Sequence, residues 1–283
     1  MQKKSAKKLT NKLCKLLISS VRKESQRLVL NNSAVSEVVG YILIFGIVMG
    51  AISFIYLVGF PALQNSQDVT QFRGVEQGFL VLQSDIAKVA YDQASVRTTK
   101  IGLGSGSLVV NPNKCNLSIT INGDLKFNDT IGLIEFTSTR NDKIAWIDGG
   151  VFKKYSSGGG SIMVFRPRIF KVTNSINNNT IFLTLIRINN SLSASSIGGS
   201  GIASITTSTN LNPSLVFNTP EVYYNGNMTI KITNEYARAW KNYLDDEFDE
   251  VGILTNNDET VTYNNIQFDE LMIVEYVIDV TAS

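Results

Sequence analysis

The sequence predicts an α+β protein, in which a long N-terminal transmembrane helix with an amphipathic continuation precedes a mainly antiparallel, sandwich-like, β-rich extracellular domain. Three observations predict it. No charged residue occurs between Val38 and Gln67, apolar residues then recur at helical spacing up to Val89, and short β-type segments separated by turns follow from about Lys100. With 283 residues, 43% of them hydrophobic, the chain is long enough to bury a sizeable core.

The apolar segment is densest from Val38 to Phe60. A bilayer core requires about 20 apolar residues in a helix, so we expect residues 35–63 to form a transmembrane helix. The alternative, a buried core helix of a soluble domain, is usually shorter and more polar on one side. Pro61 has no N–H and is expected to kink or end the helix near Leu57–Phe60.

The charge distribution gives this helix a direction in the membrane. The residues before Glu37 include nine lysines and arginines and one glutamate, a charge of +8, so the remaining residues carry −6 of the total of +2. Positive charge beside a membrane helix stays in the cytoplasm. We therefore expect a basic cytoplasmic leader over residues 1–34 and an extracellular location for residues after about 64. A secretory signal has an apolar run of only about 7–15 residues, so this helix is expected to be retained.

An amphipathic helix is expected to follow over residues 64–99, with the periodicity clearest over Gln67–Ser95. Apolar residues three or four apart define one face of a helix, and we expect this face to pack against the β-rich domain. The residues of the face are Val69, Phe72, Val75, Phe79, Leu82, Ile86 and Val89.

The expected β-rich domain spans residues 100–283. Asn122-Gly123, Asp148-Gly-Gly150 and Asn225-Gly226 are typical of hairpin turns between strands. The candidate strands are Ser107–Val110, Leu117–Asn122, Thr130–Thr137, Lys143–Ile147, Val151–Tyr155, Ser161–Phe165, Ile169–Val172, Thr180–Ile188, Gly201–Thr206, Ser214–Phe217, Val222–Tyr224, Met228–Thr233, Val251–Thr255, Glu259–Tyr263 and Leu271–Val280.

Between these strands the sequence predicts one helix and two flexible loops. The helix spans Glu235–Glu250, with Asn234 as a plausible N-cap and a buried aromatic stripe that includes Trp240. The Gly/Ser-rich stretches Ser156–Gly160 and Ser191–Ser200 are typical of flexible loops.

The residue types present exclude the commonest catalytic and metal-binding chemistry. The chain contains no His, which removes Ser-His-Asp and Cys-His catalysis and His-ligated zinc. Cys14 and Cys115 would lie on opposite sides of the bilayer and cannot pair, and Cys115 is expected to be a small buried residue. Residues 245–250 are strongly acidic, and a solvated face is favoured over a calcium site because no calcium-loop pattern is present. We expect no enzyme activity, no cofactor, no metal and no nucleic-acid partner.

Ser33-Ala-Val-Ser-Glu-Val-Val-Gly and the apolar run after it resemble the start of archaeal type IV pilin-like proteins. Those proteins carry a basic leader, a short cleavage motif that ends in Gly or Ala, then Val-Ser and a hydrophobic helix. Val58-Gly-Phe-Pro-Ala-Leu-Gln, Val75-Glu-Gln-Gly-Phe-Leu-Val-Leu and Tyr236-Ala-Arg-Ala-Trp-Lys-Asn-Tyr-Leu look like an uncharacterised group of archaeal pilin-like membrane proteins. The resemblance covers residues 33–100 well and the rest thinly.

The resemblance implies cleavage between Ala34 and Val35 by a prepilin-peptidase-like membrane protease on the cytoplasmic side. Glu37 would then be the early carboxylate of the mature chain and meet a neighbouring subunit's free amino terminus; alternatively, Glu37 only marks the cytoplasmic end of the helix. Gly46 and Gly50 form a GxxxG pair, which lets helices approach closely. The expected partners are the membrane, the protease, and further copies of the chain or other pilin-like subunits.

Five Asn-x-Ser/Thr motifs occur in the domain that is predicted to face outward, which makes them candidates for N-glycosylation. Their acceptor residues are Asn116, Asn128, Asn178, Asn189 and Asn227.

Together these observations favour a type IV pilin-like cell-surface subunit, either a minor pilin or a pseudopilin. In it, the N-terminal helix serves membrane anchoring and filament assembly, and the β-rich domain makes surface contacts. The alternative is a permanently anchored, single-pass surface binding protein that does not polymerise. Ser33 favours this alternative, because the family usually has a charged residue just before the Gly or Ala. An ectoenzyme is the least supported class, given the absence of His.

Overall fold

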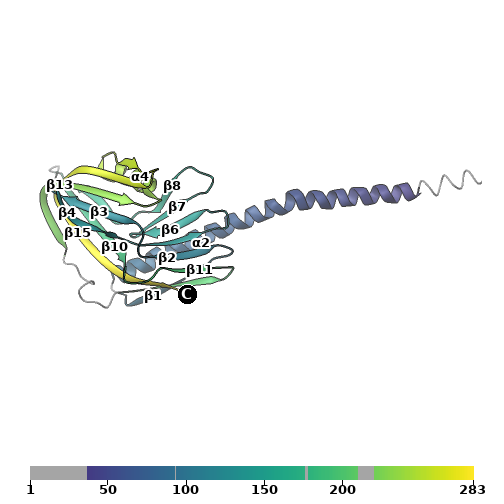
Figure 1. Cartoon of the computed structure of the whole chain (residues 1–283), viewed down its shortest axis with the longest axis horizontal. Coiled ribbons are helices and arrows are strands. Elements are labelled where there is room, and N and C mark those ends of the chain that lie inside the picture. Colours follow the sequence, from purple (N-terminus) through teal and green to yellow (C-terminus); the bar gives the residue numbers. More distant parts are fainter. Residues whose placement is uncertain (1–36, 93, 176–177, 210–219) are drawn as a thin grey trace, which may run out of the picture. The chain divides into compact units, whose positions relative to one another are not determined.

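A computed structural model describes residues 37–92, 94–175, 178–209 and 220–283. The chain divides into two compact units, Met1–Asp68 and Val69–Ser283. The predicted α+β class is confirmed: a long apolar helix precedes a mostly antiparallel β-rich domain (Figure 1).

The described part of the first unit is entirely helical and belongs to a continuous helix, Glu37–Ala90. Of the two effects expected of Pro61, a kink or an end of the helix, the second does not occur. A π-helical turn, η1 (Ile55–Gly59), precedes α2 (Phe60–Ala90), and the Phe60 N–H donates to the Ile55 carbonyl five residues back. Because proline cannot donate a hydrogen bond, this wider turn accommodates the missing donor within the helix.

Within the second unit, α2 contributes one face to the hydrophobic core, as its periodicity predicts, except that Val69 at the start of the predicted face is exposed. Its buried residues are Phe72, Val75, Phe79, Leu82, Ile86, Val89 and Ala90. The helix ends at Ala90, and β1 (Val96–Gly102) occupies residues that were expected to be helical up to position 99. The apolar face ends at Val89, and the β-branched Val96, Thr98 and Thr99 that follow favour a strand.

Two sheets form the β-rich domain, and their arrangement is visible in Figure 1. The nine-stranded sheet follows the order β1-β12-β15-β13-β3-β4, with β10 and β14 beside β15 and β9 beside β10; the six-stranded sheet follows β11-β2-β5-β6-β7-β8. The remaining strand bounds are β2 (Ser107–Asn111), β3 (Asn116–Ile121), β4 (Asp124–Thr130), β5 (Leu133–Thr137), β6 (Lys143–Ile147), β7 (Gly150–Lys154), β8 (Ser161–Phe165), β9 (Ile169–Thr173), β10 (Asn179–Ile188), β11 (Ser195–Gly198), β12 (Ile202–Thr209), β13 (Glu221–Thr233), β14 (Ile253–Thr255) and β15 (Thr260–Ala282).

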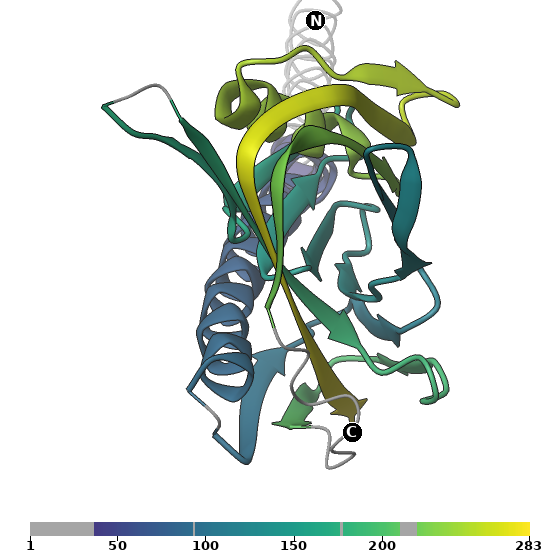
Figure 2. The same cartoon turned by 90° about the vertical axis from the view of Figure 1, so that its left-hand side faces the viewer.

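Two long strands replace four shorter predicted ones. Figure 2 shows β15 arching along the domain to the C-terminus, where it pairs antiparallel with β12, β13 and β14 and parallel with β10. Asn225-Gly226 is not a hairpin turn, because it lies inside β13. Asn225 has a φ of 50°, a local irregularity that the strand absorbs without reversing. The predicted strand Ser214–Phe217 lies outside the described residues.

Several other predictions can be compared directly with the described strands. Asn122-Gly123 joins β3 to β4 and Asp148-Gly149 joins β6 to β7, as predicted. The strands β4 and β11 were missed, and β11 lies within the expected flexible loop Ser191–Ser200.

The core consists of two clusters of buried side chains. One joins the buried face of α2 to Phe136 and Trp146 of the six-stranded sheet and to Ile278 of β15. The other lies under α4 (Ala237–Phe248), where Trp240 contacts the ring of Phe152 at a centroid distance of 5.1 Å. The predicted aromatic stripe of this helix is therefore part of the core.

Candidate functional site

The helix of the first unit presents an apolar surface on all sides. Its most apolar 18-residue stretch has a mean hydropathy of 2.5, and none of it is buried. Tyr41, Phe54 and Leu57 remain 71%, 67% and 76% exposed. A contiguous apolar surface of this kind marks contact with a membrane or with other proteins. The helix is long and apolar enough to cross a membrane.

Three of the predicted assembly residues lie on this helix. Glu37 is its first described residue and is exposed, and Gly46 and Gly50 are four residues apart, so they share a face. A Cβ built at either glycine meets no atom within 4 Å. The glycines therefore leave open space for a second helix. The predicted cleavage residues, Ala34 and Val35, lie outside the described residues.

Polar contacts within the second unit hold the rest of this helix against the sheets. Lys153 of β7 forms an ion pair with Glu76 at 2.8 Å, and the Gln71 side chain donates to the Leu103 carbonyl at 2.6 Å. The Thr99 hydroxyl donates to Asp85 at 2.9 Å. Together with the buried apolar face, these contacts make residues 69–90 part of the domain and not a linker to it.

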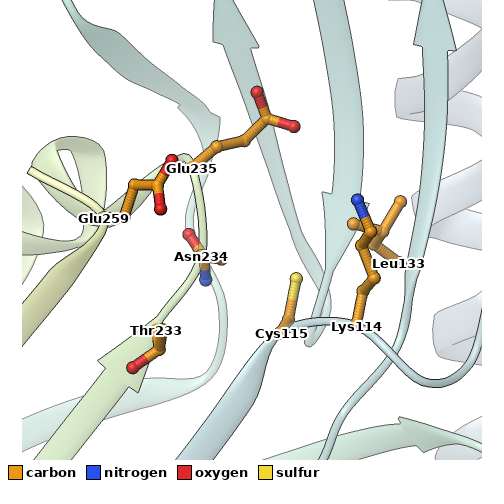
Figure 3. Close-up of a pocket in the computed structure, with 7 residues that line it drawn as sticks. All are labelled: Lys114, Cys115, Leu133, Thr233, Asn234, Glu235 and Glu259. Carbon is orange, nitrogen blue, oxygen red and sulfur yellow. The ribbon is translucent and has the colours of Figure 1, made fainter. Parts of the chain in front are cut away.

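A pocket of about 290 Å³ lies beside the start of α4 (Figure 3). Its lining residues are Lys114, Cys115, Leu133, Thr233, Asn234, Glu235 and Glu259. Cys115 is a buried free thiol, as predicted. Burial, followed by the charge of Glu135, raises the pKa of the thiol far above its usual value. The thiol is therefore protonated at neutral pH and is a poor nucleophile.

A network of charges that the sequence did not reveal joins the six-stranded sheet to the connection between β13 and α4, next to this pocket. Lys143 of β6 contacts Glu135 at 3.4 Å and donates to Glu235 at 2.9 Å; Lys154 of β7 reaches Glu235 at 3.4 Å. The Tyr236 hydroxyl donates to Glu135 at 2.8 Å. Because Lys143 and Glu235 are 92 residues apart in the sequence, no local motif could have indicated their contact.

The two carboxyl groups of this network differ in acidity. Burial, and then the nearby charge of Glu235, raise the pKa of Glu135. Burial also acts to raise the pKa of Glu235, but its hydrogen bonds and its attraction to Lys143 outweigh burial and lower it. Glu235 is therefore the stronger acid of the two. The network therefore links the six-stranded sheet to the connection between β13 and α4.

Asp148 is a second buried carboxyl group that sequence analysis assigned only to a turn. It lies at the β6–β7 turn, is 1% exposed, and accepts a hydrogen bond from the Ile186 N–H at 2.6 Å. Burial raises its pKa well above the usual value, although the hydrogen bond acts in the opposite direction. Ile186 lies on β10 beyond the end of its pairing with β9. Asp148 therefore caps a sheet edge that would otherwise be unpaired.

The acidic residues after the middle of α4 are partly paired, so the predicted solvated face is incomplete. Asp245 accepts hydrogen bonds from Tyr263 and the Gly252 N–H, and Asp249 pairs with Lys171 at 2.6 Å. Asp246 is exposed. Among the described residues, no group of three or more His, Cys, Asp or Glu side chains is placed to hold a metal ion.

The five candidate glycosylation sites differ in their surroundings. Asn116, Asn128 and Asn178 are exposed, whereas Asn189 and Asn227 are half-buried. The amide nitrogen of Asn189 donates to Asp279 at 2.8 Å, and its amide oxygen accepts from the Ser191 N–H at 3.0 Å. The same sequence motif therefore occurs at both exposed and half-buried positions.

Comparison with known proteins identifies a family for the chain but no activity. Residues 34–281, nearly the whole chain, match DUF7289, a family of unknown function. No curated protein and no solved structure matches the chain.

Proposed function

The chain belongs to DUF7289, a family of unknown function, and we propose that it is a type IV pilin-like subunit of an archaeal cell surface, a minor pilin or pseudopilin. Its N-terminal helix anchors it in the membrane before assembly and then joins a filament. Its β-rich domain faces outward and contacts surfaces or neighbouring subunits.

One observation carries this proposal: the helix Glu37–Ala90 passes from an apolar, fully exposed segment into a segment that forms part of the domain core. Such a surface requires an apolar environment, which a bilayer or a bundle of similar helices can supply equally well. The open faces of Gly46 and Gly50 favour close packing of a second helix.

Glu37 adds a reason for coupling leader removal to assembly. An ionised carboxylate inside an apolar helical assembly is costly unless an opposite charge pairs with it. Cleavage after Ala34 would create an amino terminus at Val35, two residues away, and this amine on one subunit can pair with Glu37 on the next. The same cut removes a leader with a charge of +8, which could not enter an apolar core.

The second candidate function is a permanent membrane anchor that carries a binding domain and does not polymerise. Ser33 favours it, since the resembling family usually has a charged residue at this place, and an uncut leader would keep the lysines attached. In this case the helix stays in the bilayer as a monomer.

Fractionation of cells that natively express the chain separates the two candidates. Material sheared from the cell surface is compared with the membrane fraction for the wild type, Glu37→Gln and Gly46→Leu. The filament proposal predicts that the wild type occurs in sheared material and that both variants stay in the membrane. Gly74→Ala is the matched control, because a Cβ there also meets open space but lies outside the apolar segment. A wild type found only in the membrane would favour the permanent anchor.

A further inference from the structure

Two of the candidate glycosylation motifs lie side by side on one face of the nine-stranded sheet. The strands β3 and β4 pair antiparallel, with Asn116 opposite Thr130 and Ser118 opposite Asn128. Directly opposite residues project to the same face of a sheet, and so do residues two apart in one strand. Both acceptor amides and both motif hydroxyls therefore project from a single face.

This face is the polar, outer side of the sheet. The alternate residues of β3, Leu117, Ile119 and Ile121, are buried in the core, whereas Asn116 and Asn128 are exposed. A shallow hollow of about 180 Å³ lies between the two acceptors, lined by Asn116, Ser118, Asn128, Lys231 and Thr233. In the part of the chain that the structure describes, no hydrogen bond or ion pair engages either acceptor amide, so both are free to react.

Asn189 provides an internal contrast with the same motif. Its amide nitrogen, the atom that a sugar would occupy, already donates to Asp279, and its amide oxygen accepts from the Ser191 N–H. Attachment of a sugar there would replace one of the two amide N–H groups and crowd a half-buried amide whose nitrogen and oxygen are both already engaged.

We propose that the β3–β4 face is a glycan-bearing surface, in which Asn116 and Asn128 are N-linked acceptors and Asn189 is not modified. The inference rests on the proposed function in one respect, namely that the domain faces outward. The co-reactant is a sugar carried as a lipid-linked glycosyl phosphate. The amide nitrogen forms a bond to the anomeric carbon while the bond from that carbon to the phosphate oxygen breaks. The phosphate leaves with the bonding electrons and the amide loses one proton, so no oxidant or reductant is required.

Tryptic peptide masses of the full chain, purified from cells that natively express it, test this assignment. Trypsin cleaves after Lys114, Lys126 and Arg140, so the two acceptors fall in separate peptides, 115–126 and 127–140. Both peptides are expected to carry an added sugar mass. Asn189 and Asn227 share peptide 188–231, so fragmentation of that peptide is needed to assign its residues, and it is expected to show Asn189 bare.

Substitution of the motif hydroxyls tests recognition without removing the acceptors. Ser118→Ala should abolish the added mass on peptide 115–126, and Thr130→Ala should abolish it on peptide 127–140. Thr120→Ala is the matched control, since Thr120 lies on the same face of β3 outside the motif, and it should leave both masses unchanged. An added mass on Asn189, or one that survives loss of the hydroxyl, would overturn the assignment.

Labelling intact cells with a membrane-impermeant amine reagent tests the outward orientation of the domain independently of the glycan assignment. Lys100 and Lys231 are exposed on the domain and report its side of the membrane. Bare peptides 115–126 and 127–140 from a domain that is labelled in intact cells would overturn the glycan assignment alone. Bare peptides from a domain that is labelled only after lysis would overturn both.

Discussion

Phe79→Ala tests whether residues 69–90 belong to the domain core. Phe79 lies on α2, is fully buried, and belongs to the cluster that joins α2 to both sheets. Loss of a buried phenylalanine side chain removes its transfer free energy and leaves a cavity, at a cost of about 3–5 kcal/mol. Because domains unfold with about 5–15 kcal/mol, this change should remove about a fifth or more of the total.

The assay is urea unfolding of a fragment of residues 66–283, which contains the whole second unit. Trp146 and Trp240 are both buried, so their fluorescence reports loss of the core. Val81→Ala is the matched control, because Val81 is on the same helix but 54% exposed, and it should change the free energy of unfolding by less than about 0.5 kcal/mol. If Phe79→Ala shifts the free energy by less than about 1 kcal/mol, the helix is not part of the core.

Three further predictions follow from the same contacts. A fragment of residues 92–283 should show no cooperative unfolding by near-ultraviolet circular dichroism, because it lacks six large buried side chains worth about 1.5–3 kcal/mol each; a sharp transition would contradict this. Burial raises the pKa of Asp148 in the fold, so its contribution to stability is fully present below the unfolded pKa of about 3.9 and is lost as pH rises through the folded pKa. Asp148→Asn keeps an acceptor for the Ile186 N–H and cannot ionise. Between pH 4 and 8, the free energy of unfolding should therefore decrease more in the wild type than in Asp148→Asn. Parallel pH profiles of the two proteins would refute the assignment. Lys143→Met leaves two partly buried carboxyl groups without their shared partner and should cost about 1–3 kcal/mol in urea unfolding. Lys126→Met, which breaks an exposed pair, should cost less than about 1 kcal/mol, and equal losses would show that the buried network adds nothing.

Local patterns in the sequence predicted those elements that are determined by residues close together in the sequence. The charge-free run from Val38 to Gln67 and the apolar spacing up to Val89 each depend on neighbouring residues, and both correspond to the observed helix. The extent of β13 and β15 was not predictable in this way, because the two strands pair with each other across sites such as Asn225 that resemble turns in isolation.

Elements and sites that depend on distant partners were missed for the same reason. The exposed, charged strand β4 has no alternating pattern, and it forms because β3 offers it an edge. The contacts of Glu235 with Lys143 and Lys154 join residues that only the fold brings together. Asp148 was predicted correctly as part of a turn, but its burial follows from the packing of that turn against β10.

The mature N-terminus tests the proposed role most directly. It would be determined on protein taken from the membranes of cells that natively express the chain. The filament role predicts that the mature chain starts at Val35, since removal of the basic leader is required before the apolar helix can enter a filament. An intact N-terminus with its lysines retained would contradict the filament role and would identify the chain as a permanent membrane anchor.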